Sequence, residues 1–192
     1  EFNSNGGTGT MSNQTHTYDR TLALSENTFT RVGYTFAGWN TAQDGSGTSY
    51  ANNATVSNLA ASGTVTLYAK WTANTYTVEF NSNGGTGTMF NQTHTYDGTK
   101  VLSTNAFAKV GYTFARWNTA KDGTGTSYSE QESVINLATN GTITLYAQWT
   151  ANTYVVEFNS NGGLGSMSNQ TYIYDKTLAL STNAFTRVGY TF

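Results

Sequence analysis

The feature that most constrains this chain is the repetition of its own sequence. Phe2, Phe80 and Phe158 each begin the same stretch, Phe-Asn-Ser-Asn-Gly-Gly, and they lie 78 residues apart. Between residues 1–78 and 79–156 the same residue occurs at 56 of 78 positions, with no insertion or deletion. A fixed period of this kind indicates one structural unit copied in tandem.

The period predicts the domain boundaries. The predicted domains are residues 1–74, 75–152 and 153–192. The first begins inside its first strand and the third comprises only an N-terminal half, so we expect the chain to be a piece of a longer protein. An enzyme needs one site, whereas a spacer or an array of binding modules gains from copies, so the repeat disfavours catalysis.

Composition excludes several classes of protein and partner. The chain has no Cys and no Pro, so neither a disulfide framework nor polyproline joints can stiffen it. Charged residues are only 10%, and the net charge is −2, which argues against a nucleic-acid partner. No apolar run approaches the roughly 18 residues of a membrane span and no signal peptide heads the chain, but neither absence is informative in a chain that begins and ends within a repeat. The joints, residues 72–75 and 150–153, contain neither Gly nor Pro, and joints this short leave little room for swivelling.

The second repeat predicts five elements. Alternation of apolar and polar residues predicts strands over residues 75–80, 93–96, 112–117 and 143–149. Residues 103–111 are typical of a short helix, with Ser103 as its N-cap, Gly111 as its stop, and Phe107 and Val110 facing the sheet. The order β-β-α-β-β predicts an α+β fold, predominantly β, in which each small domain is a twisted sheet with one short helix.

Four sequence blocks together carry a family resemblance. They are Phe-Asn-Ser-Asn-Gly-Gly, Tyr-Asp, Arg31-Val-Gly-Tyr-Thr-Phe-Ala-Gly-Trp39-Asn-Thr and Thr66-Leu-Tyr-Ala-Lys-Trp71. This combination resembles the Listeria–Bacteroides repeat, the B-repeat of internalin-type surface proteins. The resemblance implies tandem β-grasp-like domains on secreted or wall-anchored proteins, where the repeats act mostly as stalks or adhesive spacers. It carries over no catalytic residue, and it implies that the chain is located outside the cell or at the cell surface.

The aromatic residues admit two readings, a sugar-binding platform or a core. Because a unit of this size needs large buried side chains and because these residues recur on alternating strand positions, we expect a core. The core-defining residues are Phe36, Trp39, Trp71, Phe114, Trp117 and Trp149. Tyr18 and Tyr50, next to turns, are better candidates for exposed contact.

Several motifs resemble ligand sites but lack the chemistry. The turns that begin at Asp44 and Asp122 are similar to calcium loops, yet each supplies one carboxylate where calcium needs six to eight oxygens. His16 and His94, one in each of the first two repeats, cannot build a zinc site alone, and we expect polar tips on a strand face. No convergent pair of carboxylates with a nucleophile is evident. We therefore predict no enzyme, no cofactor and no metal.

The sequence also predicts sites of modification and partners. Asn13, Asn91 and Asn169 each begin an Asn-Gln-Thr glycosylation pattern. The expected partners are neighbouring repeats, and copies of the same chain that pair through weakly charged sheet edges. The leading function is a semi-rigid spacer or assembly unit of a stalk, adhesin or filament. The alternative is a multivalent module that binds glycans or a host-surface protein.

Overall fold

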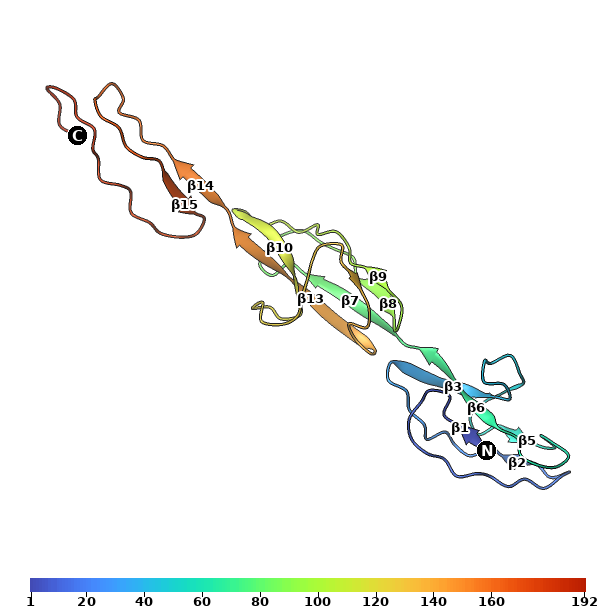
Figure 1. The fold of residues 1–192 in the computed structure, drawn as a ribbon. Coiled ribbons are helices and arrows are strands. Elements are labelled where there is room, and N and C mark those ends of the chain that lie inside the picture. The colour runs from blue at the N-terminus through green and yellow to red at the C-terminus, as the bar shows by residue number, and fades with distance from the viewer. The chain divides into compact units, whose positions relative to one another are not determined.

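A computed structural model describes all of residues 1–192, and the chain is all-β with no helix (Figure 1). The strands of the first repeat are β1 (Phe2–Asn3), β2 (Leu22–Ala23), β3 (Tyr34–Asn40), β4 (Ser49–Tyr50), β5 (Thr55–Val56) and β6 (Leu67–Ala73). Those of the second are β7 (Thr75–Asn81), β8 (Gln92–Thr95), β9 (Lys100–Val101), β10 (Tyr112–Asn118), β11 (Ser127–Tyr128), β12 (Ser133–Val134) and β13 (Gly141–Ala151). The third has β14 (Thr153–Val156) and β15 (Gln170–Ile173).

The chain forms two compact units whose limits differ from those of the repeats. The first unit comprises residues 1–79, 91–102 and 133–143. The second comprises residues 80–90, 103–132 and 144–192. The first unit therefore contains the whole of the first repeat and parts of the second, and the second unit contains the rest of the second repeat and all of the third.

The main sheet of the first repeat has the order β1-β6-β3-β4. β6 runs parallel to β1, with Phe2 opposite Leu67, and antiparallel to β3, with Trp39 opposite Ala69. Along β6, Leu67 and Ala69 are buried while the residues between and after them are less so, as alternation in a half-buried strand requires. β2 and β5 form a separate two-stranded sheet.

The second repeat builds a five-stranded sheet in the order β11-β10-β13-β7-β8, with β9 and β12 paired apart from it. β10 carries a bulge between Phe114 and Arg116 at the position where β3 has one between Phe36 and Gly38. Strands β7, β8, β10 and β13 confirm the four strands that alternation predicts. In the third repeat β14 pairs with β15 alone.

A tryptophan at the end of β3 is the centre of the first core. Trp39 has none of its surface exposed, and its ring centroid lies 4.8 Å from that of Phe2, 4.9 Å from Phe36 and 6.1 Å from Phe29. The second repeat reproduces this arrangement around Trp117, at 4.8 Å from Phe80 and 6.1 Å from Phe107. Such offset and edge-on pairs are the favoured aromatic geometries.

The predicted helix over residues 103–111 is absent, so the α+β, β-grasp-like prediction is wrong. Residues 109–112 form a β-turn instead, in which the Tyr112 N–H donates to the Lys109 carbonyl at 3.0 Å. Gly111 has φ +76°, which suits the third position of a type II turn as well as the residue after a helix. Phe107 is buried as expected, but Val110 is 84% exposed.

The segment before this turn is extended because its polar groups are satisfied in other ways. The Asn105 side chain accepts from the Phe107 N–H and donates to the Phe107 carbonyl, at 3.0 and 2.9 Å. Ala108 then bridges to Thr86 in an isolated antiparallel pair. An asparagine that hydrogen-bonds the backbone two residues on competes with helix formation.

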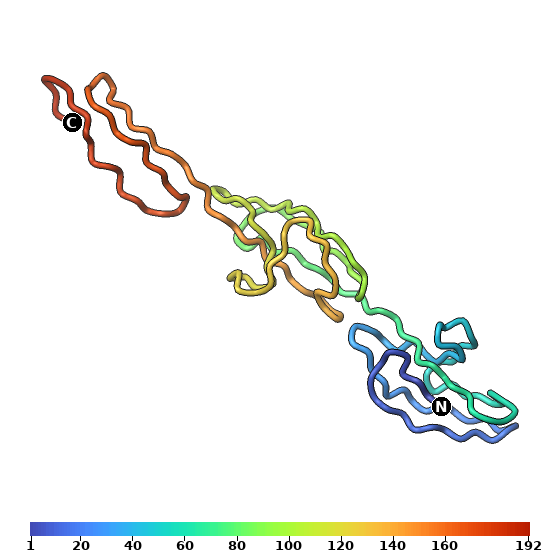
Figure 2. The backbone as a smooth tube through the Cα atoms, viewed as in Figure 1, coloured from blue at the N-terminus to red at the C-terminus, as the bar shows by residue number.

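One residue separates the last long strand of a repeat from the first strand of the next. β6 ends at Ala73 and β7 begins at Thr75, and Figure 2 shows this part of the chain running on without a loop. β13 and β14 are separated in the same way by Asn152. The predicted four-residue joints are therefore mostly strand.

Candidate functional site

The first joint is fixed by the four polar groups of Asn74, all within the first unit. Its N–H donates to the Gly33 carbonyl and its carbonyl accepts from the Tyr96 N–H, both at 2.8 Å. Its side-chain oxygen accepts from the Thr35 hydroxyl at 2.6 Å, and its side-chain nitrogen donates to the Thr139 carbonyl at 3.2 Å. A residue held at every polar group leaves its backbone little freedom.

The second joint, within the second unit, repeats this pattern at Asn152. The Asn152 N–H donates to the Gly111 carbonyl at 2.8 Å, and its carbonyl accepts from the Tyr174 N–H at 2.8 Å. Its side-chain oxygen accepts from the Thr113 hydroxyl at 2.6 Å. Three of the four contacts therefore recur at the second joint, which shows that they are a feature of the repeat.

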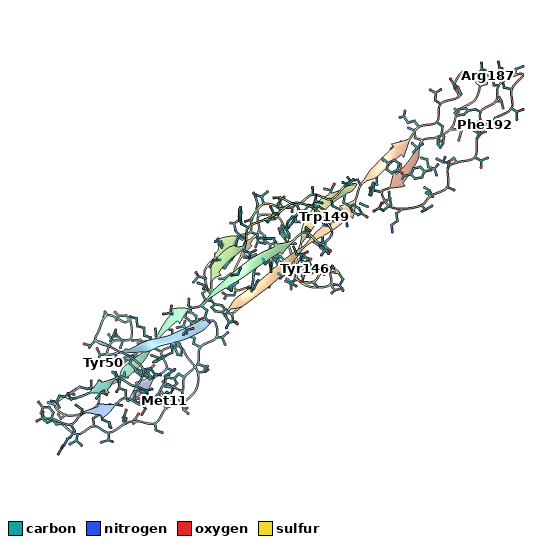
Figure 3. All side chains as sticks on the ribbon, turned by 180° about the vertical axis from the view of Figure 1, so that it is seen from behind. Met11, Tyr50, Tyr146, Trp149, Arg187 and Phe192 are labelled. Atoms are coloured by element: carbon teal, nitrogen blue, oxygen red, sulfur yellow. The ribbon has the colours of Figure 1, made fainter.

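The predicted core aromatics fall into two groups. Trp39 and Trp117 are fully buried, whereas the other four, Phe36, Trp71, Phe114 and Trp149, are partly buried. The Trp71 indole N–H donates to the Ser4 carbonyl at 2.9 Å, and Trp149, labelled on β13 in Figure 3, does the same to Ser82. Through these hydrogen bonds, each indole ring closes the Asn-Gly-Gly turn that follows its serine partner.

The two tyrosines expected at the surface differ. Tyr18 is 58% exposed, but Tyr50 is partly buried and packs, with Met11, against the first core. Both Met11 and Tyr50 are labelled in Figure 3.

A buried asparagine organises each loop that resembles a calcium site. Asn40 is 1% exposed, and its side-chain nitrogen donates to the Gly45 and Gly47 carbonyls at 3.1 Å. Its side-chain oxygen accepts from the Ala42 and Gly47 N–H groups at 2.8 and 3.0 Å. Asn118 makes the equivalent contacts in the second repeat. An amide side chain therefore occupies the centre of the loop.

The carboxylates of these loops accept hydrogen bonds from residues of the same loop. Asp44 accepts from the Ser46 hydroxyl and N–H at 2.6 and 3.0 Å, and these bonds hold the pKa of Asp44 below its ordinary value. Asp122 does the same with Thr124. Nowhere in the chain do three His, Cys, Asp or Glu side chains gather in a group that could hold a metal ion.

His94 lies on the buried face of β8 instead of being a polar tip. It is 1% exposed, and its ring lies 5.3 Å from that of Tyr76. Neither ring nitrogen has a hydrogen-bond partner. Burial, and then the nearby positive charge of Lys100, lower the pKa of His94.

A hollow of about 410 Å³ lies beside His16 in the first repeat. Its lining includes Leu59, whose counterpart Leu137 donates its N–H to the Tyr76 hydroxyl at 3.2 Å in the second repeat. There the equivalent space holds Tyr76 and Val78, both buried. The hollow therefore corresponds to a core position and not to a ligand site.

The three glycosylation-pattern asparagines, Asn13, Asn91 and Asn169, are all exposed. Their placement is compatible with modification, which stays a prediction. The structure contains no helix long and apolar enough to span a membrane.

The residues that sequence reasoning missed are the four asparagines of the loops and joints: Asn40, Asn118, Asn74 and Asn152. In the sequence these asparagines are marked only by recurrence at the 78-residue period, and many residues with a smaller structural role recur in the same way.

Comparison with known proteins places the chain in a family. The Listeria-Bacteroides repeat domain matches residues 1–70, 76–148 and 154–192. A protein of Evansella cellulosilytica named "Putative Gly-rich membrane protein" is 41% identical over 147 residues, covering 74% of this chain and 17% of that protein. Internalin H of Listeria monocytogenes is 38% identical over 123 residues, covering 64% of this chain and 20% of that protein.

The chain thus spans a fifth or less of the length of these curated relatives. No solved structure matches it. With three matches that together take in almost every residue, the chain belongs to the Listeria-Bacteroides repeat domain family.

Proposed function

We propose that the chain is a structural segment of an extracellular surface protein, such as a stalk, adhesin or filament, in which the repeats act as a semi-rigid spacer. The observation that carries this proposal is the joint. A single residue, Asn74 or Asn152, separates consecutive strands and is hydrogen-bonded through its backbone and side chain. A chain that passes between repeats in this way adds length without adding a flexible loop.

The names of the relatives and the family support the location and the class. One relative is named as a membrane protein and another as an internalin. The matched family is a repeat domain and not a family of enzymes. The packing of the aromatic rings in and around the core agrees with a spacer function.

Removal of one repeat tests the proposal. Deleting residues 75–152 joins Asn74 to Thr153 and so restores the sequence of the natural joint. A spacer should then show a smaller hydrodynamic radius and unchanged binding to a glycan array. A multivalent binder would instead lose glycan affinity with the lost copy, which would contradict the spacer function.

Association through sheet edges remains the proposed route to assembly. β8 is an edge of the five-stranded sheet, and its outward residues Thr93 and Thr95 are uncharged and exposed. Concentration-dependent sedimentation of the same two chains tests this route, and monomers at every concentration would exclude it.

A further inference from the structure

Two turns from neighbouring repeats meet in the first unit. The edge of one ring faces the other in the pair Tyr34 and Tyr96, whose centroids lie 5.8 Å apart at 75°. The Tyr34 hydroxyl donates to the Asp97 carboxylate at 2.7 Å, and the Arg31 guanidinium lies 3.9 Å from the centre of the Tyr34 ring. The two turns are thus held by a ring–ring contact, a hydrogen bond and a cation–π contact, and each of these restricts the orientation of the others.

A glycine makes this approach possible. Gly33 has φ +75°, and a Cβ at this position would overlap the ring of Tyr96. The position therefore needs glycine for its backbone conformation and again for the neighbouring ring.

The second unit contains the same set of contacts. Tyr112 and Tyr174 lie 5.7 Å apart at 75°, and the Tyr112 hydroxyl donates to Asp175 at 3.0 Å. The Lys109 ammonium lies 4.3 Å from the Tyr112 ring centre, and a Cβ at Gly111 would overlap the ring of Tyr174. Lysine replaces arginine without loss of the arrangement.

Each of the two turns is also formed in a repeat where it has no partner turn. In the first repeat the turn at Asp19 is held by Asn58, whose side chain exchanges hydrogen bonds of 2.7 and 2.8 Å with it, although Tyr18 is exposed. Asn136 holds Asp97 in the same way at 2.6 and 2.7 Å. In the third repeat Arg187 lies 4.3 Å from the centre of the Tyr190 ring.

We propose that these two turns are the halves of a docking interface that couples each repeat to the next. The first half is the Gly-Tyr turn, with Gly33 and Tyr34 as its example. The second is the Tyr-Asp turn, with Tyr96 and Asp97 as its example. The partner that the Gly-Tyr turn fits is the Tyr-Asp turn of another copy of this repeat. Because both halves are held in shape without a partner, docking costs little ordering.

The titration of the paired groups agrees with this coupling. The hydrogen bond to Asp97 raises the pKa of Tyr34, and the bonds from Asn136 and then from Tyr34 lower the pKa of Asp97. The inference does not depend on the spacer function, because repeats that bind glycans could be coupled in the same way.

A double-mutant cycle tests the interface in the whole chain. Tyr34→Phe removes the donor and Asp97→Ala the acceptor of the same hydrogen bond, so each should lower the urea midpoint. The double variant should then lose no more than the larger single loss. In the matched control, Tyr34→Phe is combined with Asp19→Ala, which alters the equivalent turn without a tyrosine partner, and the losses should add. Additive losses in both cycles, or no loss from either single substitution, would overturn the proposal.

A second variant keeps the test independent of one hydrogen bond. Gly33→Ala should raise the rate of proteolytic cleavage within residues 72–75 by about tenfold, because the docked turn can no longer close over the joint. Gly189→Ala carries a similar backbone cost at φ +78° but has nothing within 4 Å of the added Cβ. Its cleavage rate at residues 72–75 should match that of the unmodified chain, and equal rates for the two variants would overturn the proposal.

Discussion

At the scale of the residue, the burial of His94 lowers the stability of the fold. Its two ring nitrogens have no hydrogen-bond partner, and a charged imidazole in that place would add the penalty of desolvation. The third repeat has Tyr172 at this position, 6% exposed and stacked on Tyr154 at 5.4 Å. The site therefore accepts an aromatic ring of either kind, and only the histidine makes it sensitive to pH.

His94→Tyr should remove that sensitivity. Because the folded pKa of His94 is lowered, the unfolded chain takes up the proton first, at about pH 6.5. The free energy of unfolding is then highest above this pH and falls as the pH drops from it toward the folded pKa. Urea unfolding at pH 8 and pH 5 should show a smaller loss for His94→Tyr than for the unmodified chain. An equal loss in the two chains would show that His94 does not titrate in this way.

The residues that matter most in the loops and joints could not be predicted individually. Asn40 and Asn74 occur in a chain rich in asparagine, and most of the other asparagines are exposed. Periodicity marks a position as structural, but it does not say which polar group is buried or hydrogen-bonded. That information depends on contacts such as Asn74 with Thr139, which are 65 residues apart in the sequence.

At the scale of the element, strands were predictable and the helix was not. Alternation over Thr75–Asn81 identifies a strand because one face of it is buried. Residues 103–111 also have an apolar spacing of three, from Phe107 to Val110, which a helix would place on one face. In an extended chain this spacing has no such meaning, and the glycine that ends the segment serves a turn. Local sequence signals alone do not separate these two cases.

Val110→Pro distinguishes a turn from a helix at this place. Val110 is the second residue of the turn, where proline is favoured, and its N–H donates no hydrogen bond within the chain. We expect the urea midpoint to stay the same or to rise, since proline also restricts the unfolded chain. In the last turn of a helix the same substitution would cost about 3 kcal/mol. A destabilisation of that size would favour the helix and contradict the turn.

At the scale of the whole molecule, the proposed spacer function depends on how one repeat is joined to the next. The repeat period, the absence of Gly and Pro from the joints and the family resemblance all follow from the sequence. The reduction of each joint to one asparagine, and the tyrosine contacts beside it, do not, because they bring together segments more than 60 residues apart. A tandem array whose neighbours interact behaves as a coupled chain and not as separate beads.

The most direct test is the distribution of distances between equivalent points of two adjacent repeats. Thr17→Cys and Thr95→Cys place spin labels at exposed positions one period apart within the first unit, and the chain has no other cysteine. Double electron–electron resonance should give one narrow distribution, which Gly33→Ala broadens and Gly189→Ala does not. A broad distribution in the chain without either glycine substitution would show that the joint swivels, and would contradict the account.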